Sequence, residues 1–198
     1  MSRFLIMRHA ASLSNVEGTV QGTLDVPLAP LGKMQAKVAG EALRGETITR
    51  IVASPLSRTK ETAQIVAETI GFGKSVEFHA GLCARDLGEW AGKSRESIKE
   101  MWNDLQHPFR NDPHFAPPDG ESLHVVEQRT FDAIDEINAT SEGLVLFVMH
   151  LIGTGAVIDR YTGQRPPFNN TEVWEIFPEE KQANLLYTPS DAFLPGHE

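Results

Sequence analysis

The sequence predicts an α/β fold in three layers (α/β/α), with a mostly parallel central sheet between two layers of helices. Short apolar runs alternate with longer segments of helical periodicity, and this alternation is typical of parallel sheets. No repeat, low-complexity tract or linker between two apolar cores interrupts the alternation. We therefore expect one domain over residues 1–187, followed by a tail, residues 188–198, that has no periodic pattern.

Six short apolar runs are the expected strands. They are rich in Val, Ile, Leu and Phe, which suit the pleated and buried surface of a sheet. In chain order they are Arg3–Met7, Ile48–Ala53, Val76–Phe78, Leu144–Met149, Val173–Phe177 and, with a weaker pattern, Ala183–Tyr187.

Helical patterns fill the intervals between these runs. Ser54 and Pro55 favour a helix start, because serine caps a first turn and proline suits its first position. Gly71 suits the end of the same helix. In chain order the expected helices are Leu31–Arg44, Pro55–Ile70, Ser94–Leu105, Ser122–Ala139 and Gly153–Tyr161.

Residues 106–120 are expected to form a long loop that contains four of the 12 prolines and two of the seven histidines. Long loops in compact domains are often functional, so one interpretation is a lid or specificity loop. The alternative is a crossover that only links two helices, and the sequence favours neither.

The net charge of −9, without a cluster of Lys and Arg, disfavours nucleic acid and anionic membranes as partners. An anionic small substrate is compatible with this net charge. Salt screens the repulsion beyond about 8 Å, and two close arginines can dominate the electrostatic potential inside a cleft. The single cysteine, Cys83, excludes an internal disulfide and favours a reducing cytoplasm. We interpret it as a packed residue rather than a nucleophile. No apolar run approaches the roughly 20 residues of a membrane span.

Chemically active side chains follow the ends of three expected strands. The first strand runs into Arg8 and His9, and a later one runs into His150. Ligands of open α/β sheets bind beyond the carboxyl ends of strands, so both imidazoles are expected at one edge if both strands are parallel and central. Arg58 is expected in the first helical turn at that edge, where unpaired N–H groups suit phosphate. Each residue alone has an ordinary structural explanation, but together they predict a phosphate site.

Six segments of the chain carry recognisable motifs. In chain order they are MRHAASLSN, QGTLDVPLAPLGKMQA, ASPLSRTKETAQIVAE, LGEWAGKS, PPDGESL and FVMH. They resemble motifs of the histidine phosphatase superfamily, which has the phosphoglycerate mutase-like fold. The resemblance extends from about residue 3 to residue 177, and the preserved order of six separate motifs makes it specific.

The resemblance implies roles for the matching residues. His9 would be the nucleophile that forms a phosphohistidine, and His150 would donate a hydrogen bond to the phosphoryl group. Arg8 and Arg58 would bind the phosphoryl oxygens, for which the planar and permanently charged fork of arginine is suited. The residues implied to line the substrate pocket are Ser12, Asn15 and Gln21.

The resemblance implies no metal and no cofactor. Two arginines and a helix terminus supply the positive charge that a metal otherwise provides. The histidine spacing fits no common zinc pattern, although His107 and His114 keep a metal site open as an alternative. The expected partner is a small phosphorylated substrate, and the substrate's identity and the oligomeric state stay open.

Three positions depart from the family pattern. Ala10 and Leu151 stand where glycine is usual after the two histidines. Ala84 stands where the family has the glutamic acid that protonates the leaving oxygen. Because such an acid contributes about 10²–10⁴-fold to the rate, we expect alkyl phosphates to be slowed far more than esters of acidic phenols.

Asp86 is the substitute acid that we favour, since residues 84 and 86 of an extended segment point the same way. Glu121 is a more distant alternative. A third interpretation makes Asp86 a surface residue that pairs with Arg85 or Arg95.

The function that we favour is that of a metal-independent phosphatase, a phosphoric monoester hydrolase acting on a small phosphorylated metabolite through a phosphohistidine. The alternative is a catalytically weakened member of the family that binds a phosphorylated ligand or partner. A phosphoglycerate mutase is less favoured, because family mutases tend to be longer and need the missing acid in both half-reactions.

Overall fold

A computed structural model describes residues 3–101 and 112–190 of the chain. The strands are β1 (Phe4–Arg8), β2 (Ile48–Ala53), β3 (Glu77–Phe78), β4 (Leu144–Met149), β5 (Val173–Phe177) and β6 (Gln182–Tyr187). The helices are α1 (Leu13–Glu17), α2 (Pro30–Ala42), α3 (Ser57–Ile70), α4 (Arg95–Met101), α6 (Leu123–Ala139) and α7 (Leu151–Thr162). Two single 3-10 turns are η1 (Ala80–Leu82) and η2 (Gly88–Trp90).

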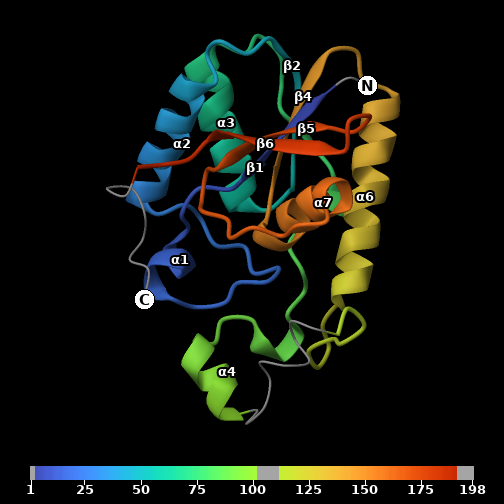
Figure 1. The fold of residues 1–198 in the computed structure, drawn as a ribbon. Coiled ribbons are helices and arrows are strands. Elements are labelled where there is room, and N and C mark those ends of the chain that lie inside the picture. Colours follow the sequence, from blue (N-terminus) through green and yellow to red (C-terminus); the bar gives the residue numbers. More distant parts are fainter. Residues whose placement is uncertain (1–2, 102–111, 191–198) are drawn as a thin grey trace.

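The strands form one six-stranded sheet in the order β3-β2-β4-β1-β5-β6. β4 pairs in parallel with β1 and with β2, and β3 pairs in parallel with β2. β5 and β6 complete the sheet in antiparallel fashion beyond β1. Helices α2 and α3 lie on one face of the sheet and α6 and α7 on the other, while α1 and α4 lie beyond one end of the strands (Figure 1). The expected α/β class and its three layers are confirmed.

Each central strand buries side chains on both faces. In β1, Phe4 and Ile6 pack in the core under α6 and α7, whereas Leu5 and Met7 pack toward α2 and α3. All six residues of β4 are buried, as expected for a strand covered by helices on both sides. The register places Arg8 beside Met149, so β1 and β4 end at the same level.

The start of α3 differs from the sequence expectation. Ser54 and Pro55 precede the helix, which begins at Ser57. Asp25, from the loop between α1 and α2, accepts hydrogen bonds from the Ser57 backbone N–H (2.6 Å) and hydroxyl (2.8 Å). Asp25 thus accepts the hydrogen bonds at the start of α3 that the sequence predicts for Ser54. The Ser54 hydroxyl instead contacts His150.

The expected loop at residues 106–120 is described from residue 112 onward. Its second half packs against the η2 turn, because Pro118 O accepts a hydrogen bond from the Glu89 N–H (3.1 Å). Residues 102–111 lie outside the described residues, and with them the end of the helix expected at Ser94–Leu105 and the side chain of His107. Residues 191–198 of the expected tail also lie outside. Within the described residues, no helix combines the length and the apolar character needed to cross a bilayer.

Candidate active site

Three adjacent strands end side by side and deliver the expected residues to one edge of the sheet. The His9 N–H donates to Met149 O (2.9 Å), and the Ser54 N–H donates to Val148 O (3.1 Å). His9 follows β1 and His150 follows β4, and their ring centroids lie 5.1 Å apart. The two imidazoles therefore meet although they are far apart in the sequence.

His9 is held with one ring nitrogen already engaged. Its Nδ1 lies 2.7 Å from the carbonyl oxygen of Ala10, and a carbonyl only accepts, so Nδ1 carries the proton of the neutral ring. The lone pair is then on Nε2. Burial lowers the pKa of His9 well below its ordinary range, and the positive charges of Arg58 and Arg8 lower it further. His9 is 4% exposed and neutral near pH 7.

His150 is held through its other nitrogen. Its Nε2 lies 2.9 Å from Ser54 Oγ, whereas Nδ1 is buried and has no hydrogen-bond partner among the described residues. Burial lowers the pKa of His150 as well, and His9, Arg58 and Arg8 add to the effect. The unpartnered Nδ1 is the polar atom that a phosphoryl oxygen would satisfy.

Arg58 is 1% exposed and lies in the first turn of α3, where the sequence placed it. Its guanidinium donates to Leu24 O (2.7 Å) and Gly22 O (2.8 Å). Burial lowers its pKa to about 10, which leaves it fully charged at neutral pH. Arg58 Nε has no hydrogen-bond partner among the described residues, so the cation keeps donors for an anion.

The loop between α7 and β5 contacts Arg8 and His9 through several hydrogen bonds. Arg8 Nη1 donates to Phe168 O (2.7 Å), and the buried side chain of Asn170 donates to His9 O (2.8 Å). The Thr171 N–H donates to Arg8 O (3.1 Å), and Thr171 takes a φ of 61° to do so. Sequence reasoning missed this loop. The polar run Asn169–Thr171 before a strand was the available signal.

The three residues implied to line the substrate pocket are not equivalent in the structure. Ser12 and Asn15 form a capping box at the start of α1, in which Asn15 Oδ1 accepts from the Ser12 N–H (3.1 Å). They shape the loop that follows His9. Gln21 precedes Gly22 in the loop that holds Arg58, and its Oε1 is buried without a partner among the described residues.

Ala84, which stands where the family usually has its acid, lines a cavity of about 290 Å³. Ala84 and Asp86 both line it, as the alternation of an extended segment predicted, and Glu121 and Arg129 lie in its wall. Asp86 Oδ1 accepts a hydrogen bond from the Gly88 N–H (2.9 Å). No ion pair among the described residues includes Asp86, and the side chain of Arg95, the other expected partner, lies outside the described part of the structure.

Glu121 is tied to Arg129 by two hydrogen bonds, of 3.0 Å and 2.8 Å. Burial opposes its ionisation, but the hydrogen bonds from Arg129 and from the Asp86 N–H outweigh that effect and lower the pKa of Glu121. A carboxyl group held ionised in this way is poorly suited to donate a proton.

Ala10 and Leu151, the other two positions that depart from the family pattern, lie in different surroundings. The methyl group of Ala10 packs in a small apolar cluster with Leu28 and Ala36. The Ala10 N–H donates to Thr62 Oγ1 (3.0 Å), which ties the His9 loop to α3. Leu151 is the first residue of α7 and is 40% exposed.

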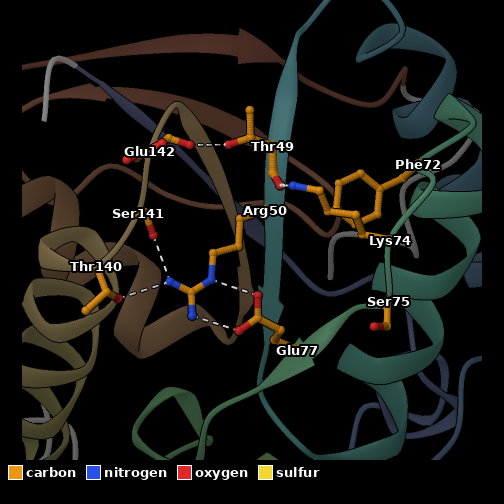
Figure 2. Close-up of a pocket in the computed structure, with 9 residues that line it drawn as sticks. All are labelled: Thr49, Arg50, Phe72, Lys74, Ser75, Glu77, Thr140, Ser141 and Glu142. Carbon is orange, nitrogen blue, oxygen red and sulfur yellow. Dashed lines mark hydrogen bonds and ion pairs between the residues drawn. The ribbon is translucent and has the colours of Figure 1, made fainter.

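A larger depression, of about 470 Å³, lies at the opposite end of the strands (Figure 2). Its arginine, Arg50, donates two hydrogen bonds of 2.7 Å to Glu77 and one of 2.8 Å to Ser141 Oγ. Lys74 donates to Thr49 O (3.0 Å). Because its cations already have acceptors, this depression is a weaker candidate for an anion than the edge that carries His9.

Comparison with known proteins decides the family. The profile of the histidine phosphatase superfamily (branch 1) matches residues 4–185. The chain belongs to this superfamily. Among its members, a probable phosphoglycerate mutase, GpmB of Salmonella arizonae, is 30% identical over 165 residues, which are 82% of this chain and 76% of that protein.

Two solved structures show the same fold. A mycobacterial glucosyl-3-phosphoglycerate phosphatase in complex with VO3 has a TM-score of 0.81 at 26% identity, covering 88% of this chain and 92% of that one. YhfR of Bacillus stearothermophilus has a TM-score of 0.81 at 26% identity, covering 93% and 95%. Histidine phosphatase membership, with phosphatase and mutase relatives, makes this chain an enzyme of phosphoryl transfer on phosphorylated metabolites.

Proposed function

We propose that the protein is a phosphoric monoester hydrolase that uses His9 Nε2 as its nucleophile. The observation that carries the proposal is the hydrogen bond from His9 Nδ1–H to Ala10 O, because it leaves the lone pair on Nε2 in a ring that stays neutral. Besides burial, the positive charges of Arg58 and Arg8 lower the pKa of this ring and of His150, which favours two neutral imidazoles.

The reaction has two balanced steps. Nε2 attacks phosphorus, the bond to the leaving oxygen breaks, and the leaving oxygen takes a proton from an acid. Water then attacks the phosphohistidine, returns a proton to that acid, and releases inorganic phosphate with neutral His9. Arg8, Arg58 and the Nδ1–H of His150 stabilise the charge that spreads over the three phosphoryl oxygens.

Asp86 is the proton donor that we propose. It lines the cavity beside Ala84, and one of its carboxylate oxygens keeps its position through the Gly88 N–H. Glu121 is the weaker candidate because Arg129 holds it as a carboxylate.

Steady-state hydrolysis of an aryl and an alkyl phosphate by wild type and His9→Ala tests the proposal. We expect turnover of the aryl ester that the substitution abolishes, and an acid-labile phosphohistidine on His9 detectable by mass spectrometry after rapid quenching. In addition, Asp86→Asn is expected to slow the alkyl ester by about 10²-fold or more and the aryl ester far less. Equal slowing of both esters would exclude Asp86 as the acid.

A second candidate function, binding of a phosphorylated ligand without turnover, is motivated by the alanine at position 84. It predicts equal residual hydrolysis by wild type and His9→Ala. It also predicts phosphate binding by calorimetry that weakens in Arg58→Met, since Arg58 supplies buried positive charge.

A further inference from the structure

The cavity beside Ala84 is linked to the proposed phosphate site through neighbouring residues. Its lining residues are Thr23, Ala80, Cys83, Ala84, Asp86, Glu121 and Arg129. Thr23 lies between Gly22 and Leu24, whose carbonyls hold Arg58. Cys83 Sγ lies 3.8 Å from Ser54 Oγ, which in turn contacts His150. A phosphate bound at the imidazoles therefore has this cavity next to it.

Arg129 is the one cation among the described residues of the lining, and its N–H groups are all occupied. Nε and Nη2 donate to the two carboxylate oxygens of Glu121 (3.0 Å and 2.8 Å). Nη1 donates to Gly81 O (2.9 Å) and Cys83 O (2.8 Å), and Nη2 also donates to Ala84 O (2.8 Å). These five bonds use the five donors of a guanidinium group. Arg129 has none left for a ligand.

The groups that remain in the lining accept hydrogen bonds or are apolar. The charge of Glu121 is matched by Arg129. Asp86 supplies the proton in the proposed reaction, the hydroxyl of Thr23 can accept from a ligand, and Ala80 and Ala84 contribute methyl groups. This lining suits hydroxyl groups, and an anionic substituent would find no free cation among the described residues to balance it.

We propose that this cavity binds the leaving group of the substrate, and that the leaving group is an alcohol without a negative charge, with a hydroxyl group that donates to Thr23. The inference rests on the proposed phosphatase function and adds the substrate class. It separates this chain from the two relatives reported above whose names refer to phosphoglycerate and hence to a leaving group with a carboxylate.

Glycerol 3-phosphate and 3-phosphoglycerate form a matched pair for the test, because they differ at one carbon, which is a hydroxymethyl group in one and a carboxylate in the other. We expect kcat/KM of the wild type to favour glycerol 3-phosphate by at least about tenfold, since a carboxylate in this cavity loses water without gaining a free cation among the described residues. Where turnover is slow, the competitive inhibition constants of both compounds against an aryl phosphate give the same ratio.

Substitution of Thr23 tests whether the charge of the cavity wall sets the preference between the two substrates. Thr23→Met, of similar length to lysine but uncharged, is the matched control because it loses the same hydroxyl. Thr23→Lys adds a cation to the cavity wall and is expected to shift the ratio at least about fivefold toward 3-phosphoglycerate relative to Thr23→Met.

The outcomes separate the two proposals. Hydrolysis of 3-phosphoglycerate as fast as glycerol 3-phosphate by an active wild type overturns the inference and leaves the phosphatase function intact. The same ratio in Thr23→Lys and Thr23→Met also overturns it, because the cavity then does not contact the leaving group. Failure to hydrolyse these compounds and an aryl phosphate alike overturns the function itself and the inference with it.

Discussion

The Nε2 atom of His150 and the hydroxyl of Ser54 lie 2.9 Å apart, and this contact leaves Nδ1 as the nitrogen that is available to the proposed phosphate site. A phosphoryl oxygen only accepts hydrogen bonds, so the nitrogen that meets it must carry the proton. In a neutral ring, Nδ1–H then requires Nε2 to accept from the Ser54 hydroxyl. Ser54 is fully buried and its N–H is bonded to Val148 O, so its position is set by the sheet.

Ser54→Ala removes the hydroxyl that favours the tautomer of His150 with its proton on Nδ1. We expect kcat for an aryl phosphate to fall by about five- to tenfold, which corresponds to about 1 kcal/mol for one hydrogen bond. The double variant with His150→Ala should be no slower than His150→Ala alone, because Ser54 acts through that ring. Additive losses in the double variant would show that Ser54 acts elsewhere.

Ala84→Glu should restore the acid that the family usually has at this position. The side chain would extend into the 290 Å³ cavity beside the phosphate site. We expect an alkyl phosphate to be hydrolysed at least about tenfold faster and an aryl phosphate to change little, since general acids contribute about 10²–10⁴-fold to poor leaving groups. Ala84→Gln has the same shape without the proton and should give no gain. A gain in both variants would point to packing instead.

Arg58→Lys keeps a positive charge at the proposed phosphate site but loses the planar guanidinium group with its several donors. Lysine has a single nitrogen, which cannot bond Gly22 O and Leu24 O and still meet an oxyanion in the geometry that Arg58 offers. We expect kcat/KM to fall by at least about 10²-fold, from the loss of charge-assisted hydrogen bonds that contribute about 1.5–3 kcal/mol each. The control is Arg44→Lys on an exposed helix end, which should keep full activity.

The imidazole pair should make stability depend on pH in the acidic range. The pKa of His9 and of His150 is lowered by burial in the folded protein, whereas in the unfolded chain it is about 6.5. Below about pH 6.5 the unfolded state therefore binds more protons, so the free energy of unfolding falls as pH drops from this value toward the folded pKa values. We expect Tm to fall from pH 7 to pH 5.

The variant with His9→Asn and His150→Asn should show a shallower fall of Tm over this range. His114→Asn, which alters an exposed histidine, should keep the wild-type slope. Identical slopes in all three proteins would mean that the pair does not titrate as described.

Gly32 lets α2 approach the loop that follows His9. A Cβ atom at this position would lie 2.0 Å from Ala11 O, which also accepts a hydrogen bond from the Ala29 N–H. We expect Gly32→Ala to lower the free energy of unfolding by about 1–3 kcal/mol or more, measured by urea denaturation. Gly45→Ala is the control, because its Cβ would have no neighbour within 4 Å, and it should change stability by less than about 0.5 kcal/mol.

The convergence of His9, His150 and Arg58 could be predicted from the sequence. Strands that run parallel in one sheet end at one edge, so residues that directly follow them meet whatever their distance along the chain. The short apolar runs before His9 and His150 marked these strand ends. The helix that carries Arg58 had to begin near the same edge because it follows a third strand.

The contacts that orient these residues could not be predicted in the same way. Asp25 caps α3 in place of Ser54, and Asn170 holds His9 from a loop far along the chain. A capping serine and a turn asparagine look alike in any sequence, and their partners depend on which loops the folded sheet brings together. Local propensity therefore placed the helix start two residues early and gave no role to Asn170.

The position of β4 between β1 and β2 also bears on when the protein becomes active during synthesis. A ribosome releases β1 and β2 long before β4, yet in the finished sheet these two strands are separated by β4 and do not pair with each other. A nascent chain that ends before His150 thus has neither the central strand nor the second imidazole. The central strand and the second imidazole are therefore made together, and translation products that end before His150 are expected to be inert rather than partly active.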